Sequence, residues 1–252
     1  MEDPNTTIEN LALTIEYDGT RYNGFQYQPM LPTIQSELEL AVAKITGQNT
    51  RIRGASRTDS QVHAQGQVVA FRTSIRHTET TWIKALNYHL PWDIKVKGAR
   101  RVPMSFDARR DALCRVYRYS ILNTETSSPL LYNQCAWERT PLNCEAMADA
   151  SRCLIGTHDF SLLSGQLPEH IPTIRNVKRW DVWRDGNLIQ IEAEANAFLP
   201  YQIRKTNAIL VEIGKGSANR SLLESLVNGK KINDVKTGTL PAKGLCLLRV
   251  EY

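Results

Sequence analysis

The sequence predicts an α+β protein in which one pattern of strands and helices occurs twice. Hydrophobic residues make up 42% of the 252-residue chain and charged residues 23%, values that are typical of ordinary folded proteins. Short segments that alternate apolar and polar residues recur along the chain, and segments with helical spacing of apolar residues lie between them. This composition and this interleaving of elements argue against coiled-coil and disordered chains.

The first half of the chain, residues 1–104, carries six predicted elements. Residues 11–17 (LALTIEY) alternate apolar and polar side chains and end at an Asp-Gly turn, which is typical of a strand. Ile34, Leu38 and Ala41 recur at helical spacing before Gly47, so a helix is expected over 34–46. The other predicted elements of this half are strands at 50–56 and 66–72, a helix at 79–88 and a strand at 94–102. The order βαββαβ is that of the split unit in ferredoxin-like domains.

The second half, residues 105–252, repeats much of this order. Its predicted elements are strands at 113–122, 174–183, 188–196 and 245–251 and helices at 144–154, 201–213 and 219–227. Two proline-containing segments, 124–141 and 164–174, are expected to be long loops. The halves share no repeat of identical residues, so their relationship rests on element order alone.

The net charge indicates what kind of molecule the protein binds, and the cysteine content indicates the cellular compartment in which it works. The formal net charge of +5 and the sequence pI near 9.0 favour encounters with polyanions such as nucleic acid. Five cysteines without a CxxC pair indicate neither a disulfide framework nor a zinc site, and we expect reduced, mostly buried thiols. The first residues lack a basic region before an apolar one, and no apolar run reaches the length of a membrane span. We therefore expect a cytoplasmic protein.

One polar loop between two predicted strands brings together residue types that can do chemistry. Arg57, Thr58, Asp59 and His63 lie close together in the segment 55–71. An arginine near an aspartate can keep that carboxylate ionised in a partly dry pocket, where it could act as a base or a nucleophile. On spacing alone, a solvated ion pair in a surface loop explains the pattern better.

A family resemblance changes this interpretation. The segment RTDSQVHAQGQV resembles the RTD-x-G-V-H-A-x-G-Q-V motif of the TruA-type tRNA pseudouridine synthases. Further blocks resemble that family in the same order: EYDGTRYNGFQ, TIQSELE, ALNYHLPWDIKV, FDARRDALCRVYRYSILN, GTHDFSLL, RNV, EANAFLPYQIRK and PAKGLCLLRVEY. The resemblance spans nearly the whole chain. It implies the pseudouridine synthase fold, in which two ferredoxin-like halves are joined through a continuous, mostly antiparallel sheet.

The resemblance also implies a role for particular residues. Asp59 stands at the position of the catalytic aspartate, which attacks the target uridine so that the base detaches, turns and rejoins through C5. Arg57 is expected to contact the flipped nucleotide or its phosphate. Tyr117 is expected to pack on the uracil and is a candidate to help remove the C5 proton. Arg204 matches the arginine that pairs with the aspartate, and Leu245 matches the apolar floor of the pocket. The resemblance implies no cofactor and no metal.

The implied substrate is uridine in the anticodon stem-loop of tRNA, at positions 38 to 40. A uridine inside a helix must be extruded before it can react, which costs least in a loop or a weak stem. The family resemblance also implies a homodimer, with a positive cleft built across two chains. Attack of Asp59 on the base and attack on C1′ of the ribose both stay open.

Two further segments are candidates for contacts to the RNA. The stretch between residues 95 and 118 is strongly basic and contains Lys95, Lys97, Arg100, Arg101, Arg109, Arg110, Arg115 and Arg118. We expect at least some of these side chains to contact RNA, although a charge run is usually a solvated face. Arg21, Tyr22 and Phe25 resemble a family loop near the RNA, and we take Arg21 as a substrate-binding candidate.

Some polar and aromatic residues have simpler interpretations. The pair His158-Asp159 is expected to form a structural turn, and His63 to fix the catalytic loop by a hydrogen bond. The five tryptophans are expected in the core or in an interface.

The chain departs from the family pattern at a few positions. Gln61 replaces the glycine of RTD-x-G-V-H, which matters if that residue needs a positive φ angle. Ser56, where glycine often precedes the RTD motif, is a milder departure, and the helix segment 205–208 and the pair Pro200-Tyr201 also differ from the family pattern. Two other functions therefore stay open: a tRNA-binding chaperone of the same fold that has lost activity, and an unrelated aspartate-dependent hydrolase. The lack of a second acidic cluster near Asp59 argues against the hydrolase.

Overall fold

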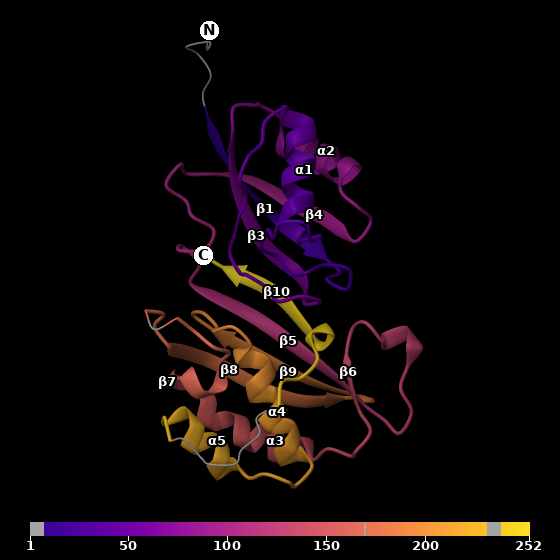
Figure 1. The fold of residues 1–252 in the computed structure, drawn as a ribbon, viewed down its shortest axis with the longest axis vertical. Coiled ribbons are helices and arrows are strands. Elements are labelled where there is room, and N and C mark those ends of the chain that lie inside the picture. The colour runs from indigo at the N-terminus through magenta and orange to yellow at the C-terminus, as the bar shows by residue number, and fades with distance from the viewer. Residues whose placement is uncertain (1–7, 169, 231–237) are drawn as a thin grey trace. The chain divides into compact units, whose positions relative to one another are not determined.

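A computed structural model describes residues 8–168, 170–230 and 238–252 (Figure 1). The chain divides into two compact units. Unit 1 comprises the described residues up to Leu113 together with Leu247–Tyr252, and unit 2 comprises those of Cys114–Cys246.

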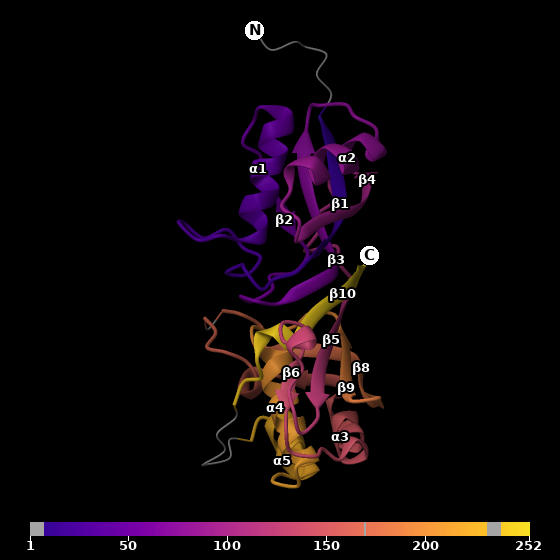
Figure 2. The ribbon, with the colours of Figure 1, turned by 90° about the vertical axis from the view of Figure 1, so that its right-hand side faces the viewer.

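Unit 1 has the element order of a split βαβ domain. Its elements are β1 (Glu9–Tyr17), α1 (Ile34–Thr46), β2 (Arg53–Gly54), β3 (His63–Thr73), α2 (Glu79–His89) and β4 (Ile94–Val102). The strands lie in the order β4-β1-β3, with β1 antiparallel to both neighbours, and β2 pairs with β3. Helices α1 and α2 cover one face of this sheet (Figure 2).

The local chemistry of the sequence explains why α1 begins and ends where it does. Thr33 caps its first turn by accepting a hydrogen bond from the backbone N–H of Ser36, and Gly47 ends it in the left-handed conformation at φ 71°. The buried face of the helix carries Leu38, which is 0% exposed. Burial of one such leucine stabilises the fold by roughly 2 kcal/mol.

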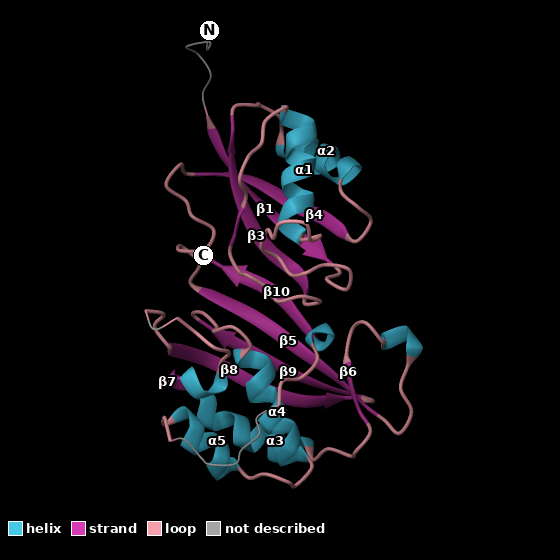
Figure 3. Ribbon diagram, viewed as in Figure 1, coloured by secondary structure: helices cyan, strands magenta, loops and turns pink. Residues whose placement is uncertain are grey.

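The described residues of unit 2 form strands and three helices. Its elements are β5 (Cys114–Asn123), β6 (Ala136–Glu138), α3 (Cys144–Ser151), β7 (Gly156–Asp159), β8 (Ile174–Asp185), β9 (Leu188–Ala195), α4 (Gln202–Gly214) and α5 (Arg220–Val227). The strand order is β5-β9-β8-β7, all antiparallel, and β6 lies parallel to β5 (Figure 3). The last strand, β10 (Leu245–Glu251), begins in unit 2 and continues into unit 1.

The described residues also form short 3₁₀ helices at Pro129–Leu131, Arg152–Leu154, Ser161–Leu163 and Ala242–Gly244. Helices α3, α4 and α5 pack against one another. No helix among the described residues is long and apolar enough to cross a membrane.

The α+β class and most of the predicted elements are confirmed. The helix at 34–46 and the strands at 94–102 and 245–251 have the predicted bounds. The strand expected at 50–56 is wrong in length, because only Arg53 and Gly54 pair with β3 before the chain turns into the polar loop. The loop expected at 124–141 contains β6, whose three residues are too few to show a periodicity.

The block around His158 is a strand and not only a turn. Residues Gly156–Asp159 form β7 and pair with β8, a long-range contact that four residues of local sequence do not reveal. No disulfide joins the five cysteines, all of which lie among the described residues, but only Cys114 and Cys135 are buried, so the prediction of mostly buried thiols is wrong for the other three. Trp82 and Trp180 lie in the core as predicted, whereas Trp92, Trp137 and Trp183 are partly or largely exposed.

Candidate active site

The loop that carries Asp59 joins β2 to β3 in unit 1, and a buried glutamine fixes its first residues. The backbone N–H of Ala55 donates to the carbonyl of Val68 at 2.8 Å. Gln67 accepts a hydrogen bond from the backbone N–H of Ser56 at 3.1 Å and donates to the carbonyl of the same residue at 2.7 Å. Gln67 is 0% exposed, so its amide is fully committed to this loop. Sequence reasoning missed this role, although Gln67 lies in the quoted motif.

The middle of the loop rests on the segment between Tyr17 and Phe25. The backbone N–H of Phe25 donates to the carbonyl of Thr58 at 3.0 Å, and the Thr58 hydroxyl shares a buried hydrogen bond of 2.8 Å with the Tyr17 hydroxyl. The carbonyl of Tyr22 accepts from the backbone N–H of Gln61 at 3.2 Å. The block EYDGTRYNGFQ is therefore the support of the aspartate loop.

Two glycines in this support allow the close approach. Gly24 has a φ of 90°, and a Cβ placed there would lie 2.8 Å from the carbonyl oxygen of Thr58 and 3.2 Å from the carbonyl carbon of Asp59. A Cβ on Gly19 would collide with the carbonyl of Val62. A side chain at either position would push the loop away, so these glycines hold the backbone on both sides of Asp59.

The last residues of the loop adopt the special conformation that the sequence comparison suggested. Gln61 has a φ of 65°, in the left-handed region that glycine occupies without strain. The backbone N–H of Val62 donates to the carbonyl of Asp59 at 3.2 Å and closes the turn. Gln61 thus preserves the turn of the motif at the cost of some backbone strain.

His63 fixes the loop from its far end, as predicted. Its Nδ1 atom accepts a hydrogen bond from the backbone N–H of Gly19 at 3.1 Å and lies 3.2 Å from Oδ1 of Asp18. Burial opposes ionisation of Asp18, but the hydrogen bonds from Thr20 and the proximity of His63 outweigh it and lower the pKa of this carboxyl. Asp18 is therefore charged at neutral pH and holds the turn at residues 18–20.

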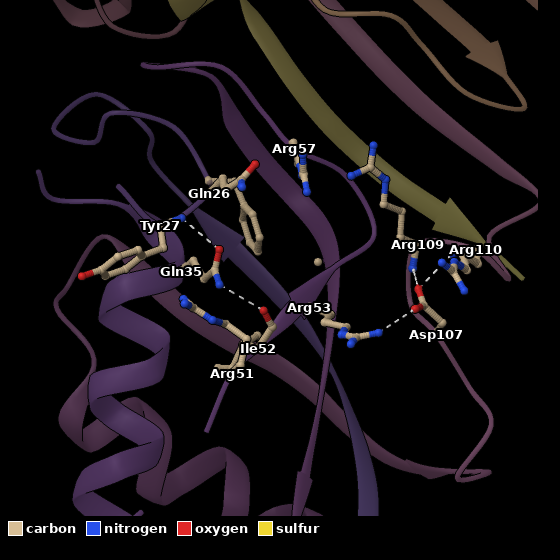
Figure 4. Close-up of a pocket in the computed structure, with 12 residues that line it drawn as sticks. Gln26, Tyr27, Gln35, Arg51, Ile52, Arg53, Arg57, Asp107, Arg109 and Arg110 are labelled. Atoms are coloured by element: carbon tan, nitrogen blue, oxygen red, sulfur yellow. Dashed lines mark hydrogen bonds and ion pairs between the residues drawn. The ribbon is translucent and has the colours of Figure 1, made fainter. Parts of the chain in front are cut away.

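Arg57, two residues before Asp59, lines a cavity of about 460 Å³ on unit 1 (Figure 4). Partial burial and the positive charge of Arg109 both lower the pKa of the Arg57 guanidinium. Two positive groups that repel each other in a cavity favour an anion between them.

Arg21 is engaged by the protein itself. Its Nε atom donates to Oδ2 of Asp93 at 2.8 Å, and its guanidinium lies 5.5 Å from the centre of the exposed Trp92 ring. The hydroxyl of Tyr22 donates to the other oxygen of Asp93 at 2.7 Å. The Asp93 side chain is 1% exposed and was not predicted as part of the site, although it belongs to the quoted LPWD block. Half of the Arg21 side chain still faces solvent.

Three predicted residues belong to unit 2. Tyr117, on β5, is 6% exposed and meets the edge of the Phe198 ring, with the ring centres 5.5 Å apart. Arg204, on α4, donates from Nε to the carbonyl of Leu240 at 2.8 Å and lies over the ring of Tyr201. Leu245, at the start of β10, is also 6% exposed. Sequence reasoning assigned no role in the site to Phe198 or Tyr201, although both lie in the quoted block EANAFLPYQIRK.

The basic stretch between residues 95 and 118 divides into structural and accessible side chains. Lys97, Arg101 and Arg118 form ion pairs with Glu16, Glu9 and Glu192. Arg115 is buried and donates to the carbonyl of Asn196 at 2.7 Å, whereas Arg109 and Arg110 line the same cavity as Arg57.

His158 and Asp159 make local hydrogen bonds. Nε2 of His158 lies 3.0 Å from the carbonyl oxygen of Ile155, and Asp159 accepts from the backbone N–H of Ser161 at 2.9 Å. Both residues belong to strand β7, where a structural turn was predicted, and these contacts are local.

Comparison with known proteins gives the family. The family model described as tRNA pseudouridine synthase matches residues 13–111 and 150–252. A protein of Thermoanaerobacter sp. (strain X514) named tRNA pseudouridine synthase A is 38% identical over 246 residues, which cover 97% of this chain and 100% of that protein. Proteins of the same name from Geobacter sp. (strain M21) and Coxiella burnetii (strain Dugway 5J108-111) are 35% and 34% identical over 97% of this chain and 99% and 94% of their own lengths. The chain therefore belongs to the tRNA pseudouridine synthase family.

Proposed function

We propose that this protein is an isomerase that converts uridine to pseudouridine in tRNA. Full-length similarity to relatives named tRNA pseudouridine synthase A supports this activity. The observation that carries it is the loop of Asp59, whose backbone is held on both sides by Gly19 and Gly24. A nucleophile must be held within a fraction of an ångström of its productive position, and this loop is built to do so.

The reaction needs no co-reactant. The bond between N1 of uracil and C1′ of ribose breaks, and a bond between C5 and C1′ forms. C5 loses one proton and N1 gains one, so atoms and charge balance. Asp59 is the proposed nucleophile, and its target is either the base or C1′. No cofactor or metal has a part in the proposal.

The other residues are proposed to serve the same reaction. Arg204 would hold the charge of Asp59, and Arg57 would contact the flipped nucleotide or its phosphate. Tyr117 is the candidate acceptor for the C5 proton, and its apolar surroundings, together with Leu245, suit a flat base. The exposed half of Arg21 can still meet a phosphate, although Asp93 already binds its guanidinium.

The proposed site of modification is the anticodon stem-loop, where a uridine is extruded at low cost. The formal charge of +5 suits a polyanionic substrate. We extend the proposal to a homodimer that works in the cytoplasm, which rests on the family resemblance.

An inactive tRNA-binding chaperone is the other function that the sequence left open. That hypothesis depended on Gln61, but Gln61 has a φ of 65°, in the region that a glycine would occupy without strain, so a turn of this kind forms beside Asp59 without glycine. The names of the full-length relatives also favour the enzyme.

Release of tritium from [5-³H]uridine in tRNA tests the activity. The wild type should release tritium, and Asp59→Ala should lose the activity by on the order of 10³-fold or more while tRNA binding stays. Asp185→Ala, at an exposed aspartate of a hairpin turn, is the matched control and should behave as the wild type. Tritium release by Asp59→Ala at the wild-type rate would rule out Asp59 as the nucleophile.

A further inference from the structure

Positively charged side chains predominate among the charged residues that line the cavity on unit 1. Its lining includes five arginines and one aspartate: Arg51, Arg53, Arg57, Arg109, Arg110 and Asp107. They come from two segments far apart in the sequence, the strand β2 with its flanks and the turn at residues 107–110. We call this group the arginine pocket. All five arginine side chains are exposed, so a ligand can reach them.

Asp107 shapes the pocket and offsets only one of its five positive charges. Its Oδ1 atom accepts from the backbone N–H groups of Arg109 and Arg110 at 2.9 and 3.0 Å, and its Oδ2 atom accepts from Arg53 at 3.2 Å (Figure 4). Both oxygens are thus used to shape the turn and to orient one guanidinium. Burial opposes ionisation of Asp107, but these hydrogen bonds outweigh it and lower the pKa of the carboxyl.

The remaining charges differ in how they are placed. Arg51 lies on the ring of Tyr27, 5.1 Å from its centre, and pairs with Glu39, so it forms a wall of the pocket. Partial burial and the positive charge of Arg109 both lower the pKa of the Arg57 guanidinium. Two guanidinium groups in this relation raise the energy of the empty pocket, and a bound anion lowers it.

The size and the walls of the pocket favour a nucleic acid strand over a free ion. A volume of about 460 Å³ is within the range of ligand sites and is larger than one phosphate group needs. Arginine forks match phosphate oxygens, and the pocket lining also includes the exposed ring of Tyr27 and the buried ring of Phe25. Guanidinium groups beside aromatic rings are a common way to bind single-stranded RNA.

We propose that the arginine pocket binds a phosphodiester of the RNA strand next to the target uridine, with Arg53 and Arg110 as its main phosphate ligands and Asp107 as their positioning residue. This inference rests on the proposed function. It adds a binding subsite on β2 and on the turn at 107–110, outside the residues assigned to the reaction.

Binding of a labelled tRNA anticodon stem-loop over a series of salt concentrations tests this proposal. The variant Arg53→Gln/Arg110→Gln removes two pocket charges and leaves Arg57 intact. The control Arg72→Gln/Arg76→Gln removes two exposed charges of the same unit outside the pocket. Circular dichroism and Tm of each variant show that the fold is kept, and Arg53→Lys/Arg110→Lys should restore much of the binding.

We expect the pocket variant to bind roughly tenfold more weakly and to reduce the slope of log K against log salt by about 2, because each phosphate contact contributes about 1. The control should shift neither value. A pocket variant that matches the control in affinity and slope would overturn the proposal. Equal binding of uridine 5′-monophosphate and the stem-loop by the wild type would also overturn it, because the site would then take a free nucleotide.

Tritium release, measured on the same wild-type preparation, separates this proposal from the proposed function. If tritium is released but the pocket variant binds RNA like the control, the isomerase proposal is supported and the proposal that the arginine pocket binds RNA is rejected. If no tritium is released but the pocket variant loses binding and slope, the pocket stands and the isomerase fails. Absence of any RNA binding by the wild type would overturn both.

Discussion

The two units supply their candidate residues in different ways. In unit 1, Asp59 lies on a loop whose position is set by backbone contacts, and the supporting positions are two glycines and a few hydrogen bonds. In unit 2, Tyr117, Arg204 and Leu245 lie on a strand, a helix and a strand start. Their positions follow from the packing of regular elements. The position of Asp59 should therefore be sensitive to small backbone shifts. The positions of the three unit 2 residues should depend mainly on how their side chains pack.

Unit 2 also contains buried polar side-chain atoms that lack a hydrogen-bond partner, and the loop of Asp59 in unit 1 has none among the described residues. Among the described residues, the Thr206 hydroxyl and the Nδ2 atom of Asn207 on α4 are buried without a hydrogen-bond partner. Oδ1 of Asn207 does accept a hydrogen bond from Nε1 of Trp180 at 3.1 Å, so this side chain has one structural role. These buried polar atoms lower the stability that helix α4 contributes, because they have given up hydrogen bonds to water. The loop of Asp59 has no such atom among those found in the described residues.

The largest expected effect breaks the backbone support of unit 1. Gly24→Ala places a Cβ against the carbonyl of Thr58 and requires alanine at a φ of 90°. We expect a loss of about 3 kcal/mol in the free energy of unfolding, from strain and overpacking together. The rate of tritium release should fall by on the order of 100-fold, because Asp59, the proposed nucleophile, shifts.

Gly47→Ala is the matched control for that substitution. Gly47 also has a positive φ, of 71°, but no atom lies within 4 Å of its added Cβ. It should lose only about 1 kcal/mol and keep full activity. If Gly24→Ala and Gly47→Ala behave alike in urea unfolding and in tritium release, close approach at Gly24 does not hold the loop.

A smaller, pH-dependent effect is expected at Asp18. Its pKa in the folded protein lies below the ordinary value of 3.8, so its ionised form stabilises the fold. This contribution is present above about pH 3.8 and is lost as the pH falls through the lower folded value. Asp18→Asn should therefore be less stable than the wild type at neutral pH, and the difference should shrink towards pH 3. Urea unfolding from pH 3 to 7 measures it, and a constant difference would contradict this account.

Thr206→Val tests whether the buried hydroxyl on α4 of unit 2 destabilises the fold. The two side chains have the same shape, and the substitution removes a buried hydroxyl that lacks a partner among the described residues. We expect the free energy of unfolding to rise by about 1 kcal/mol, with tritium release unchanged. A loss of stability in thermal unfolding would show that this hydroxyl has a partner in solution.

The smallest expected effect concerns Gln61. Gln61→Gly relieves strain at a φ of 65° but adds freedom to the unfolded chain, so the net gain should be at most about 1 kcal/mol. Because the turn is already formed, tritium release should change less than about threefold. A large gain in activity would mean that Gln61 distorts the loop of Asp59.

The sequence predicted the element order well because periodicity and caps are local. The helix at 34–46 has a capping threonine and a final glycine, and both signals lie in the sequence itself. Strand β7 and the short β2 were missed or misjudged because they depend on pairing partners far along the chain.

Prediction of the site followed the same division. The motif led to the proposal of Arg57 and Asp59 as site residues, and the missing glycine raised the question of a positive φ at Gln61, whose φ is 65°. The roles of Gln67 and Asp93 could not be predicted, because each depends on a hydrogen bond to a residue distant in sequence or in another element. The arginine pocket was missed for the same reason: its charges come from two separate segments.

Tritium release from [5-³H]uridine-labelled tRNA by the wild type and by Asp59→Asn tests the central claim most directly. The amide has the shape of the carboxylate but cannot act as the nucleophile. The account predicts release by the wild type and none by Asp59→Asn, although both proteins bind tRNA and unfold at similar temperatures. Comparable release by the two proteins would contradict it.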